Sequence, residues 1–186
     1  MPFLNTEHSR AAYVTDFVLY SVVALALLVY LGWSLPLADW SGIAVYGLLG
    51  ALAWSALEYG LHRFVLHGLP PFSRWHAEHH RRPEALICTP TLVSAALFGG
   101  VFYLPARWLL GDWRAEAFML GLLSGYLVYT ALHHALHHGH SSNAWFLRRQ
   151  RWHARHHHVR PLGCYGVTTG FWDGCLSPRQ RLLPSR

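Results

Sequence analysis

The sequence has little formal charge and contains no lysine. Charged residues make up only 13% of the 186 residues and hydrophobic residues make up 53%. Soluble domains typically have ~25% charged residues, so this shortage argues against an ordinary soluble protein and favours a membrane protein. All fifteen basic side chains are arginine, a bias from which we draw no function.

Several common motifs are also missing. The three cysteines, Cys88, Cys164 and Cys175, show no C-x-x-C spacing, which argues against a thiolate zinc motif or a disulfide framework and favours free thiols. The first sixteen residues lack a basic segment followed by a short apolar core, so we expect no cleaved signal peptide. The net charge of +6 has no nucleic-acid motif beside it, so no nucleic-acid partner is expected.

Four long runs contain no formal charge, at 17–38, 40–57, 85–106 and 117–132. A membrane helix needs ~20 apolar residues to cross the hydrocarbon layer. We therefore predict membrane helices at 17–38, 40–61, 85–106 and 117–137, the last continuing into a histidine-rich segment. Pro36 predicts a tight turn between the first two, and residues 105–116 predict a connection between the last two. The alternative is a soluble bundle of buried helices.

Arginine is distributed unequally around these runs. Thirteen arginines lie on one side and only Arg107 and Arg114 lie on the other, which by the positive-inside rule places both termini in the cytoplasm. All fifteen histidines fall on that same face. We predict an all-α integral membrane protein, a single domain over 1–186, with four transmembrane helices and a cytosolic histidine-rich helical cap at 62–84 and 133–186 that holds a di-metal centre.

The histidines occur in closely spaced groups. These are His62-x4-His67, His76-x2-His79-His80, a cluster from His133 to His140, and His153-x2-His156-His157. Residues three and four apart share a helix face, so each H-x-x-H-H triplet can converge on one point. A five-residue step on a straight α-helix does not share a face, so His62 and His67 are expected to serve different metals. Trp75 and Trp152 each precede a triplet, and this near-repeat predicts two similarly built half-sites.

About ten convergent imidazoles exceed the needs of one ion. Neutral imidazole binds iron, zinc and copper, and two six-coordinate ions can each take four or five nitrogens while keeping a position open for oxygen. Structural zinc prefers four ligands and has no redox chemistry. The set therefore favours two iron ions, although zinc can occupy such a site in a purified sample.

A non-catalytic metal-binding or metal-moving membrane protein is the alternative from another class. A transport path places histidines or carboxylates within the membrane, and the four uncharged runs contain neither, which favours an enzyme. Glu58, at the end of the second run, is expected to be a solvated helix end or a partner for Arg63.

Together the histidine motifs resemble the fatty acid hydroxylase and sterol desaturase superfamily, and within it the fatty acid 2-hydroxylase branch. The resemblance runs from about Leu57 to Ser177. It includes the segment Gly166-Val-Thr-Thr-Gly-Phe-Trp-Asp173, which is similar to the Gly/Thr/Ser-rich segment ending in Trp-Asp after the last histidine box of that branch. The resemblance implies four membrane helices and a cytosolic cap in which about ten histidines hold two metals.

The resemblance also implies the identity of the ligands. They are His62, His67, His76, His79, His80, His133, His137, His153, His156 and His157. In the third cluster the pair His134 and His138 has the same spacing as His133 and His137, and the latter pair is preferred because Tyr129 and Leu136 match the family's flanking pattern.

Other polar residues are expected around these ligands. His134, His138 and Asp173 are alternative ligands or neighbours of the ligands, and Glu78 and Asp173 are candidates to orient ligand rings through their second nitrogen. His140 and His158 are expected beside the ligands or at the surface.

The resemblance finally implies a reaction and its partners. Two irons and O2 hydroxylate an acyl chain of a membrane lipid, at carbon 2 of a fatty acid or an amide-linked acyl chain. A carotenoid or sterol hydroxylase or desaturase of the same superfamily is the alternative. Some members carry a haem-binding electron carrier before the hydroxylase region, and this sequence shows none, so we expect a separate electron-transfer protein, cytochrome b5-like or a ferredoxin with its reductase.

Overall fold

The computed structural model describes residues 7–159 and 163–176, and within these ranges the elements are helices apart from one isolated antiparallel bridge between Glu7 and Ile87. The predicted all-α class is confirmed. The chain divides into two compact units, one formed by 1–54 and 86–127 and the other by 55–85 and 128–186. Residues 160–162 and 177–186 of the predicted cap lie outside the described residues.

Four helical stretches are long and apolar enough to cross a membrane, as predicted. They are Arg10–Ser34, Leu37–Leu66, Thr91–Leu110 and Asp112–His138. Large apolar side chains are exposed along them, for example Val14, Val18 and Val22 on α1 (Arg10–Ser34). A helix that shows apolar side chains outward as well as inward suits a lipid environment better than water, so the chain is a membrane protein.

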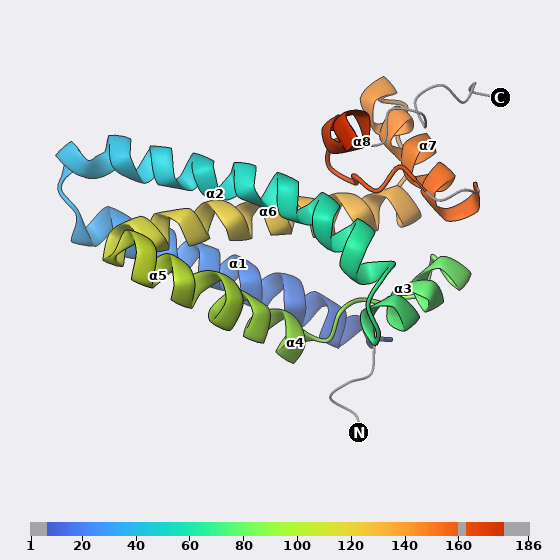
Figure 1. The fold of residues 1–186 in the computed structure, drawn as a ribbon, viewed down its shortest axis with the longest axis horizontal. Coiled ribbons are helices and arrows are strands. Elements are labelled where there is room, and N and C mark those ends of the chain that lie inside the picture. Colours follow the sequence, from blue (N-terminus) through green and yellow to red (C-terminus); the bar gives the residue numbers. More distant parts are fainter. Residues whose placement is uncertain (1–6, 160–162, 177–186) are drawn as a thin grey trace. The chain divides into compact units, whose positions relative to one another are not determined.

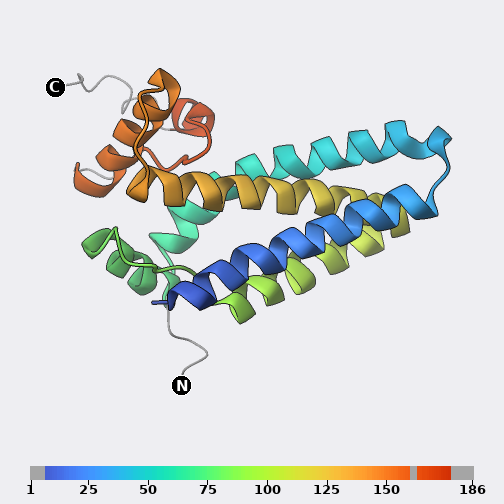
Figure 2. The same cartoon turned by 180° about the vertical axis from the view of Figure 1, so that it is seen from behind.

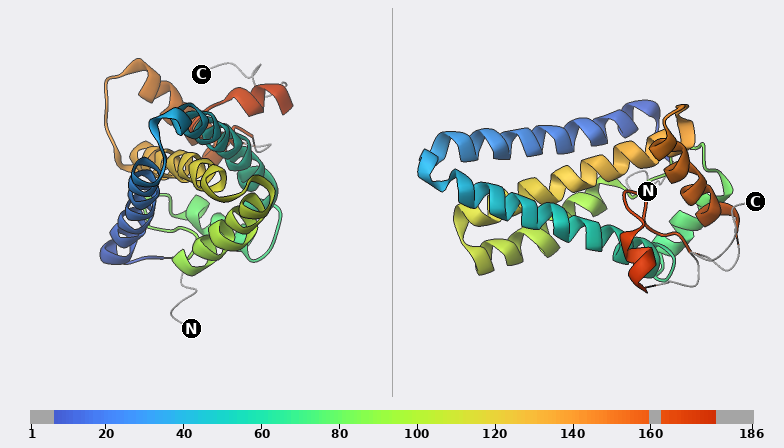
Figure 3. Two further views of the ribbon diagram at one scale, coloured as in Figure 1. Left: turned by 90° about the vertical axis from the view of Figure 1, so that its left-hand side faces the viewer. Right: turned by 90° about the horizontal axis from the view of Figure 1, so that it is seen from above.

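The first unit is a bundle of these helices (Figures 1 and 2). In chain order it contains α1, η2 (Leu37–Asp39), the first part of α2 (Trp40–Gly60), α4 (Thr91–Ala96), η4 (Leu97–Tyr103), α5 (Leu104–Leu110) and the first part of α6 (Asp112–His138). Figure 3 shows the bundle nearly end-on in its left panel. The turn predicted at Pro36 is confirmed, since the Asp39 amide donates to the Pro36 carbonyl at 3.0 Å.

Several helix boundaries differ from the predicted ones; for example, α1 begins at Arg10 rather than at residue 17 and ends at Ser34 rather than at residue 38. The third helical stretch begins at Thr91 rather than at residue 85, because Ile87 pairs with Glu7 and Pro90 precedes the first helical residue. The connection predicted over 105–116 is also wrong: α5 continues to Leu110 and α6 begins at Asp112. The break is confined to Gly111, whose φ of 78° is a conformation that glycine adopts without steric cost.

Glycines let α2 and α6 approach closely in the first unit. A Cβ added at Gly50 would lie 1.9 Å from the Phe118 carbonyl oxygen, and one added at Gly121 would lie 1.8 Å from the Gly47 carbonyl oxygen. In a membrane, the hydrophobic effect does not drive helices together. Small residues at the contact let the backbones approach closely, so that van der Waals packing stabilises the helix pair.

An aromatic cluster fills the centre of the same unit. The Tyr126 ring lies 5.0 Å from Tyr20, 5.3 Å from Trp54 and 5.0 Å from Phe98, measured between ring centroids. Tyr20 also hydrogen-bonds the Ser94 hydroxyl at 2.5 Å. The ring contacts join α1, α2, η4 and α6. The hydrogen bond to Ser94 gives the buried Tyr20 hydroxyl a partner.

The second unit collects the chain segments that carry the predicted ligands. It contains the end of α2, η3 (Leu61–Leu66), α3 (Phe72–Arg81), the end of α6, α7 (Ala144–His158) and α8 (Phe171–Leu176). Asn143 caps α7 by accepting from the amides of Trp145 and Phe146. Gln150 of α7 donates to the carbonyls of Leu136 and Gly139, which ties α7 to the last turn of α6.

Candidate metal centre

Ten histidines of the second unit form two groups of five. The first group is His62, His67, His76, His80 and His156, and the second is His79, His133, His137, His153 and His157. Within each group, one ligand atom from every residue lies within 4.8 Å of all the others. These are the ten residues predicted as ligands, divided equally between two neighbouring clusters.

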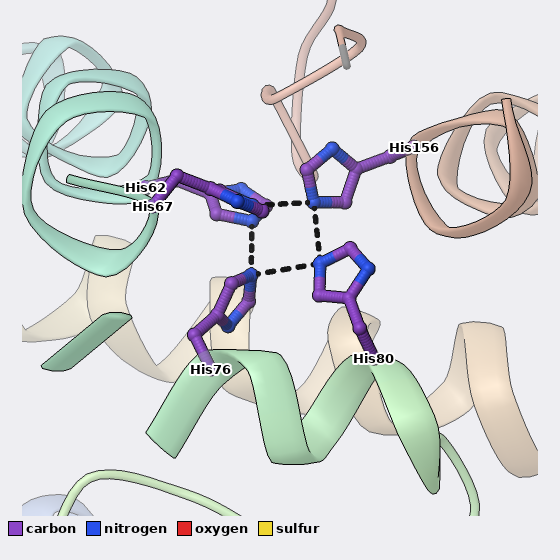
Figure 4. A group of neighbouring side chains, drawn as sticks. All are labelled: His62, His67, His76, His80 and His156. Atoms are coloured by element: carbon purple, nitrogen blue, oxygen red, sulfur yellow. Dashed lines mark hydrogen bonds between the residues drawn. The ribbon is translucent and has the colours of Figure 1, made fainter. Parts of the chain in front are cut away.

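The rings of the first group face one another (Figure 4). The Nε2 atoms of His62 and His76 lie 2.9 Å apart, those of His76 and His80 lie 3.1 Å apart, and those of His80 and His156 lie 3.1 Å apart. His67 Nε2 lies 3.1 Å from His156 Nε2. Five imidazoles from η3, the residue after it, α3 and α7 thus present the same nitrogen to one point.

The two groups are built to the same plan. Each takes two histidines from the end of a membrane-length helical stretch, two at spacing four from one of the helices α3 and α7, and one from the other of these two helices. Thus α3 gives His76 and His80 to the first group and His79 to the second, while α7 gives His153 and His157 to the second and His156 to the first. The near-repeat of the two triplets predicted paired half-sites, and the groups have that form.

Each triplet is nevertheless divided, which corrects the expectation that its three rings meet at one point. In an α-helix the i and i+4 side chains share a face most closely, and the i+3 side chain lies to one side. The middle histidine of each triplet uses that offset to reach the neighbouring group. The groups therefore adjoin, and the His80 and His157 rings stack at a centroid distance of 4.2 Å.

The expectation that His62 and His67 serve different metals is wrong, since both belong to the first group. The reason is that η3 is a π-helix over Leu61–Leu66. Its i to i+5 hydrogen bonds bring residues five apart onto one face, which an α-helix does not. π-helical turns are frequent at functional sites, and here the turn converts an unsuitable spacing into a chelating pair.

Several ring nitrogens show that a cation fits these groups. Both nitrogens of His79 are buried without a hydrogen-bond partner among the described residues, and the second group brings the Nε2 atoms of His137, His153 and His157 within 2.8 to 3.2 Å of a neighbouring Nε2. Between two facing Nε2 atoms only one proton can be shared, so five converging nitrogens cannot all satisfy each other. A metal ion bound at the centre of each group would accept the lone pairs of all five converging nitrogens.

Backbone carbonyls hold two ligands in the tautomer that a metal requires. His62 Nδ1 donates to the Tyr165 carbonyl at 2.5 Å, and His156 Nδ1 donates to the Gly163 carbonyl at 2.8 Å. With the proton on Nδ1, the Nε2 lone pair is free for a metal. Cys164, between the two carbonyl-bearing residues, has a φ of 58°, an uncommon conformation for a residue with a Cβ.

Buried charged residues hold this carbonyl-bearing segment in place. The Glu58 carboxylate accepts from the amides of Val167 and Thr168, at 2.6 and 2.8 Å, and from the Thr168 hydroxyl. Asp173 accepts from the amides of Tyr165 and Gly166, both at 2.8 Å. Because Glu58 is only 4% exposed, the expectation of a solvated helix end is wrong. Its expected partner Arg63 donates to the Tyr59 hydroxyl instead.

Arg149 of α7 also holds the segment that carries the Gly163 and Tyr165 carbonyls. Its guanidinium donates to the carbonyls of Val167 and Gly166. Sequence reasoning missed the roles of Arg149 and Glu58, because nothing distinguishes Arg149 within an arginine-rich helix and Glu58 lies far from its partners in sequence. The Gly/Thr-rich segment 166–173 was the available signal.

Burial favours the neutral form of several ligand imidazoles. Burial first, and then the neighbouring His137 imidazole, lower the pKa of His79 to about 3. The pKa values of His76 and His153 are also held well below the usual histidine value, first by burial and then by nearby imidazoles. Neutral imidazole is the form that binds metal.

Other predicted residues lie outside the two groups. His134 and His138 stack on each other with centroids 4.4 Å apart, and neither belongs to a group, nor do His140 and His158. Asp173 acts on backbone amides rather than on an imidazole. Glu78 pairs with Arg81 and Arg82, so its expected role in orienting a ligand ring is wrong.

Comparisons with known proteins agree with this arrangement. A family model described as fatty acid hydroxylase matches residues 47–177. The chain is 32% identical over 152 residues to fatty acid 2-hydroxylase of Macaca fascicularis, covering 75% of this chain and 40% of the relative. It is 34% identical over 136 residues to dihydroceramide fatty acyl 2-hydroxylase of Arabidopsis thaliana, covering 67% of this chain and 56% of the relative. The chain thus spans only about half of the length of these relatives, 40% of the first and 56% of the second.

A solved structure shows the same fold. It is described as full-length scs7p with only the hydroxylase domain visible, and it aligns with a TM-score of 0.77 at 24% identity, covering 91% of this chain and 66% of the other.

Proposed function

The chain belongs to the fatty acid hydroxylase family, and from this premise we infer that it is a membrane-bound lipid hydroxylase that inserts oxygen into a C–H bond of an acyl chain. Two groups of five imidazoles, interlocked by the middle histidines of two triplets, are the observation that carries the inference. The relatives that are named as 2-hydroxylases support carbon 2 as the position of attack.

We propose iron as the metal in both groups. Nitrogen ligands in this number suit iron, whereas structural zinc prefers four ligands and offers no redox chemistry. When bound, the two irons supply the electron transfer by which O2, two external electrons and two protons convert a C–H bond into C–OH and water. Each group of five nitrogens can fill most of the coordination sphere of an ion while leaving one position open.

The protein's own residues prepare the centre for that chemistry. The Tyr165 and Gly163 carbonyls orient His62 and His156, and Glu58, Asp173 and Arg149 fix the segment that carries those carbonyls. His62, His153 and His156 are at most 3% exposed, so bulk water has little access to the ligands. A dry, rigid set of ligands limits side reactions of a reactive centre.

The partners and orientation follow from the same proposal. The substrate is an acyl chain of a bilayer lipid, either a free fatty acid or an amide-linked chain. Electrons come from a separate donor protein, cytochrome b5-like or a ferredoxin with its reductase. The arginine distribution supports cytoplasmic termini and a cytoplasmic metal centre.

Lipid analysis under labelled oxygen tests the proposal. Cells that express the protein are grown under ¹⁸O2, and their acyl chains are released and analysed by mass spectrometry. We expect one ¹⁸O atom at carbon 2 of a fraction of the chains, and none in cells that carry the empty vector. Labelled carotenoids or sterols with unlabelled acyl chains would assign another substrate of the superfamily, and metal binding without any labelled product would indicate a non-catalytic protein.

A further inference from the structure

Three potential metal ligands meet in the first unit, apart from the histidine groups. They are His8, which precedes α1, Asp16 of α1, and Cys88, which precedes α4, and one ligand atom from each lies within 4.8 Å of the other two. His8 Nδ1 is 3.0 Å from Cys88 Sγ and 4.0 Å from Asp16 Oδ2. None of the three belongs to a histidine motif of the sequence.

The backbone around these residues is already fixed. The His8 amide donates to the Leu86 carbonyl at 2.9 Å, beside the bridge between Glu7 and Ile87. The His8 and Asp16 side chains are only 9% and 11% exposed. The three donor groups are therefore held together by pairing of two distant segments, and they are shielded from solvent.

One oxygen of this cluster lacks a partner. Asp16 is 8% exposed, and its Oδ1 atom is buried without a hydrogen bond among the described residues. A buried carboxylate without donors is costly, and a carboxylate in an apolar membrane helix is uncommon unless it is paired. A cation between Asp16, His8 and Cys88 would remove that cost.

The geometry argues against a thiol nucleophile activated by histidine. In a Cys–His–Asp triad the thiol and the carboxylate contact different ring nitrogens, whereas here both approach Nδ1 of His8. Burial, with the Asp16 carboxylate, raises the pKa of the Cys88 thiol to about 12, so the metal-free thiol is not a ready nucleophile.

We propose that His8, Asp16 and Cys88 bind a structural zinc ion, separate from the two histidine groups. Zinc takes nitrogen, sulfur and oxygen ligands in tetrahedral sites, and three protein ligands leave its fourth position for water. Binding displaces the Cys88 proton to solvent as the thiolate–zinc bond forms, with no change of oxidation state. The ion would link His8 to Cys88 across 80 residues of sequence and so fasten the start of α1 to the segment before α4.

Cobalt substitution tests this site independently of hydroxylation. Purified full-length protein is loaded with Co²⁺, and the near-ultraviolet thiolate-to-cobalt charge-transfer band is recorded. The histidine groups contain no cysteine and cannot produce that band. We expect it in the wild type and in Cys175→Ser, whose cysteine is exposed, and we expect its complete loss in Cys88→Ser, with one equivalent less zinc after zinc loading.

Two further variants keep the test decisive if Cys88→Ser folds poorly. Asp16→Asn and His8→Gln retain the thiol but each removes one ligand, and we expect zinc binding at this site to weaken by at least ~10-fold, the scale of losing a single supporting group. Absence of the band in the wild type, or its persistence in Cys88→Ser, would overturn the proposal. Either result leaves the iron content of the histidine groups, and hence the proposed hydroxylase function, unaffected.

Discussion

At the scale of single residues, the structure distinguishes histidines that the composition of the sequence does not. His79 has both ring nitrogens buried without a partner and belongs to the second group, whereas His140 is exposed and belongs to neither. Both are histidines on the histidine-rich side of the sequence. Their environments, rather than their residue type, predict opposite outcomes when they are replaced.

Replacing His79 should abolish hydroxylation. We expect His79→Ala to lose one metal of the pair and to lower product formation by more than the ~10- to 100-fold typical of losing a residue that only supports a ligand. His140→Ala is the matched control and should retain wild-type product. Iron per chain and hydroxylated acyl chains are measured on membranes with equal amounts of protein. Wild-type product from His79→Ala would remove this residue from the ligand set.

Cys164 should tolerate only residues that accept its backbone conformation. Its φ of 58° directs the Gly163 and Tyr165 carbonyls to His156 and His62. A β-branched side chain disfavours this conformation and glycine accepts it. We expect Cys164→Val to reduce iron affinity by about 10- to 100-fold and Cys164→Gly to bind iron as the wild type does. Equal iron titrations for the two variants would show that the segment does not position the ligands.

At the scale of elements, close helix packing and one irregular turn decide what the apolar runs can build. The π-helical η3 aligns His62 with His67, and the division of each triplet interlocks α3 with α7. The glycine contacts between α2 and α6 bring two backbones together within the first unit. The first feature departs from regular α-helical geometry, the second uses the offset of the i+3 side chain in a regular α-helix, and the third depends on the absence of a side chain on glycine.

The α2–α6 contact should not accept a large side chain. A Cβ at Gly121 would lie 1.8 Å from a backbone oxygen of α2, so Gly121→Leu forces the helices apart at a cost of about 1–3 kcal/mol or more. We expect a lower yield of monodisperse protein and a lower melting temperature in detergent. Gly100→Leu is the control, because an added Cβ there meets nothing within 4 Å. Equal melting temperatures for the two variants would contradict the packing argument.

At the scale of the whole molecule, metal binding and protons act on the same ligands. The histidine groups take residues from the ends of two membrane-length helical stretches and from α3 and α7. Bound metal therefore stabilises the folded second unit, because the unfolded chain lacks a preformed site. Protons act in the opposite direction, because they bind to imidazoles that folding keeps neutral.

Stability of the metal-free protein should fall as the pH falls. Burial lowers the pKa of His79 to about 3, while in the unfolded chain a histidine takes up a proton below pH ~6.5. The unfolded state thus binds more protons between these two values, and stability is lost progressively as the pH drops below ~6.5. Each such histidine contributes a slope of up to ~1.4 kcal/mol per pH unit.

Thermal unfolding measures both effects. We expect chelator-treated protein to melt at a lower temperature at pH 5.5 than at pH 7.5, and iron-loaded protein to melt above chelator-treated protein at pH 7.5. His79→Ala should show a shallower pH dependence when metal-free. A melting temperature of the metal-free protein that is independent of pH would show that its histidines are not held neutral by folding.

The sequence by itself determines the membrane-length helices and the paired form of the histidine groups. The uncharged runs predicted four membrane-length helices, and the repeated Trp-His-Ala-x-His-His segments predicted two similarly built half-sites, because hydrophobic length and helical spacing are local properties. The preference for His133 and His137 over His134 and His138 came from flanking residues, and only the first pair joins a group.

Only the tertiary structure decided how those residues are shared. The exchange of His79 and His156 between the groups and the support from Glu58 depend on contacts between segments far apart in the sequence. The π-turn that unites His62 with His67 is a departure from the regular α-helix that their spacing assumed. Spacing along a helix determines which side chains share a face. The packing of other segments against that face decides which of the two groups each histidine joins. Short-range patterns in a sequence do not encode that packing.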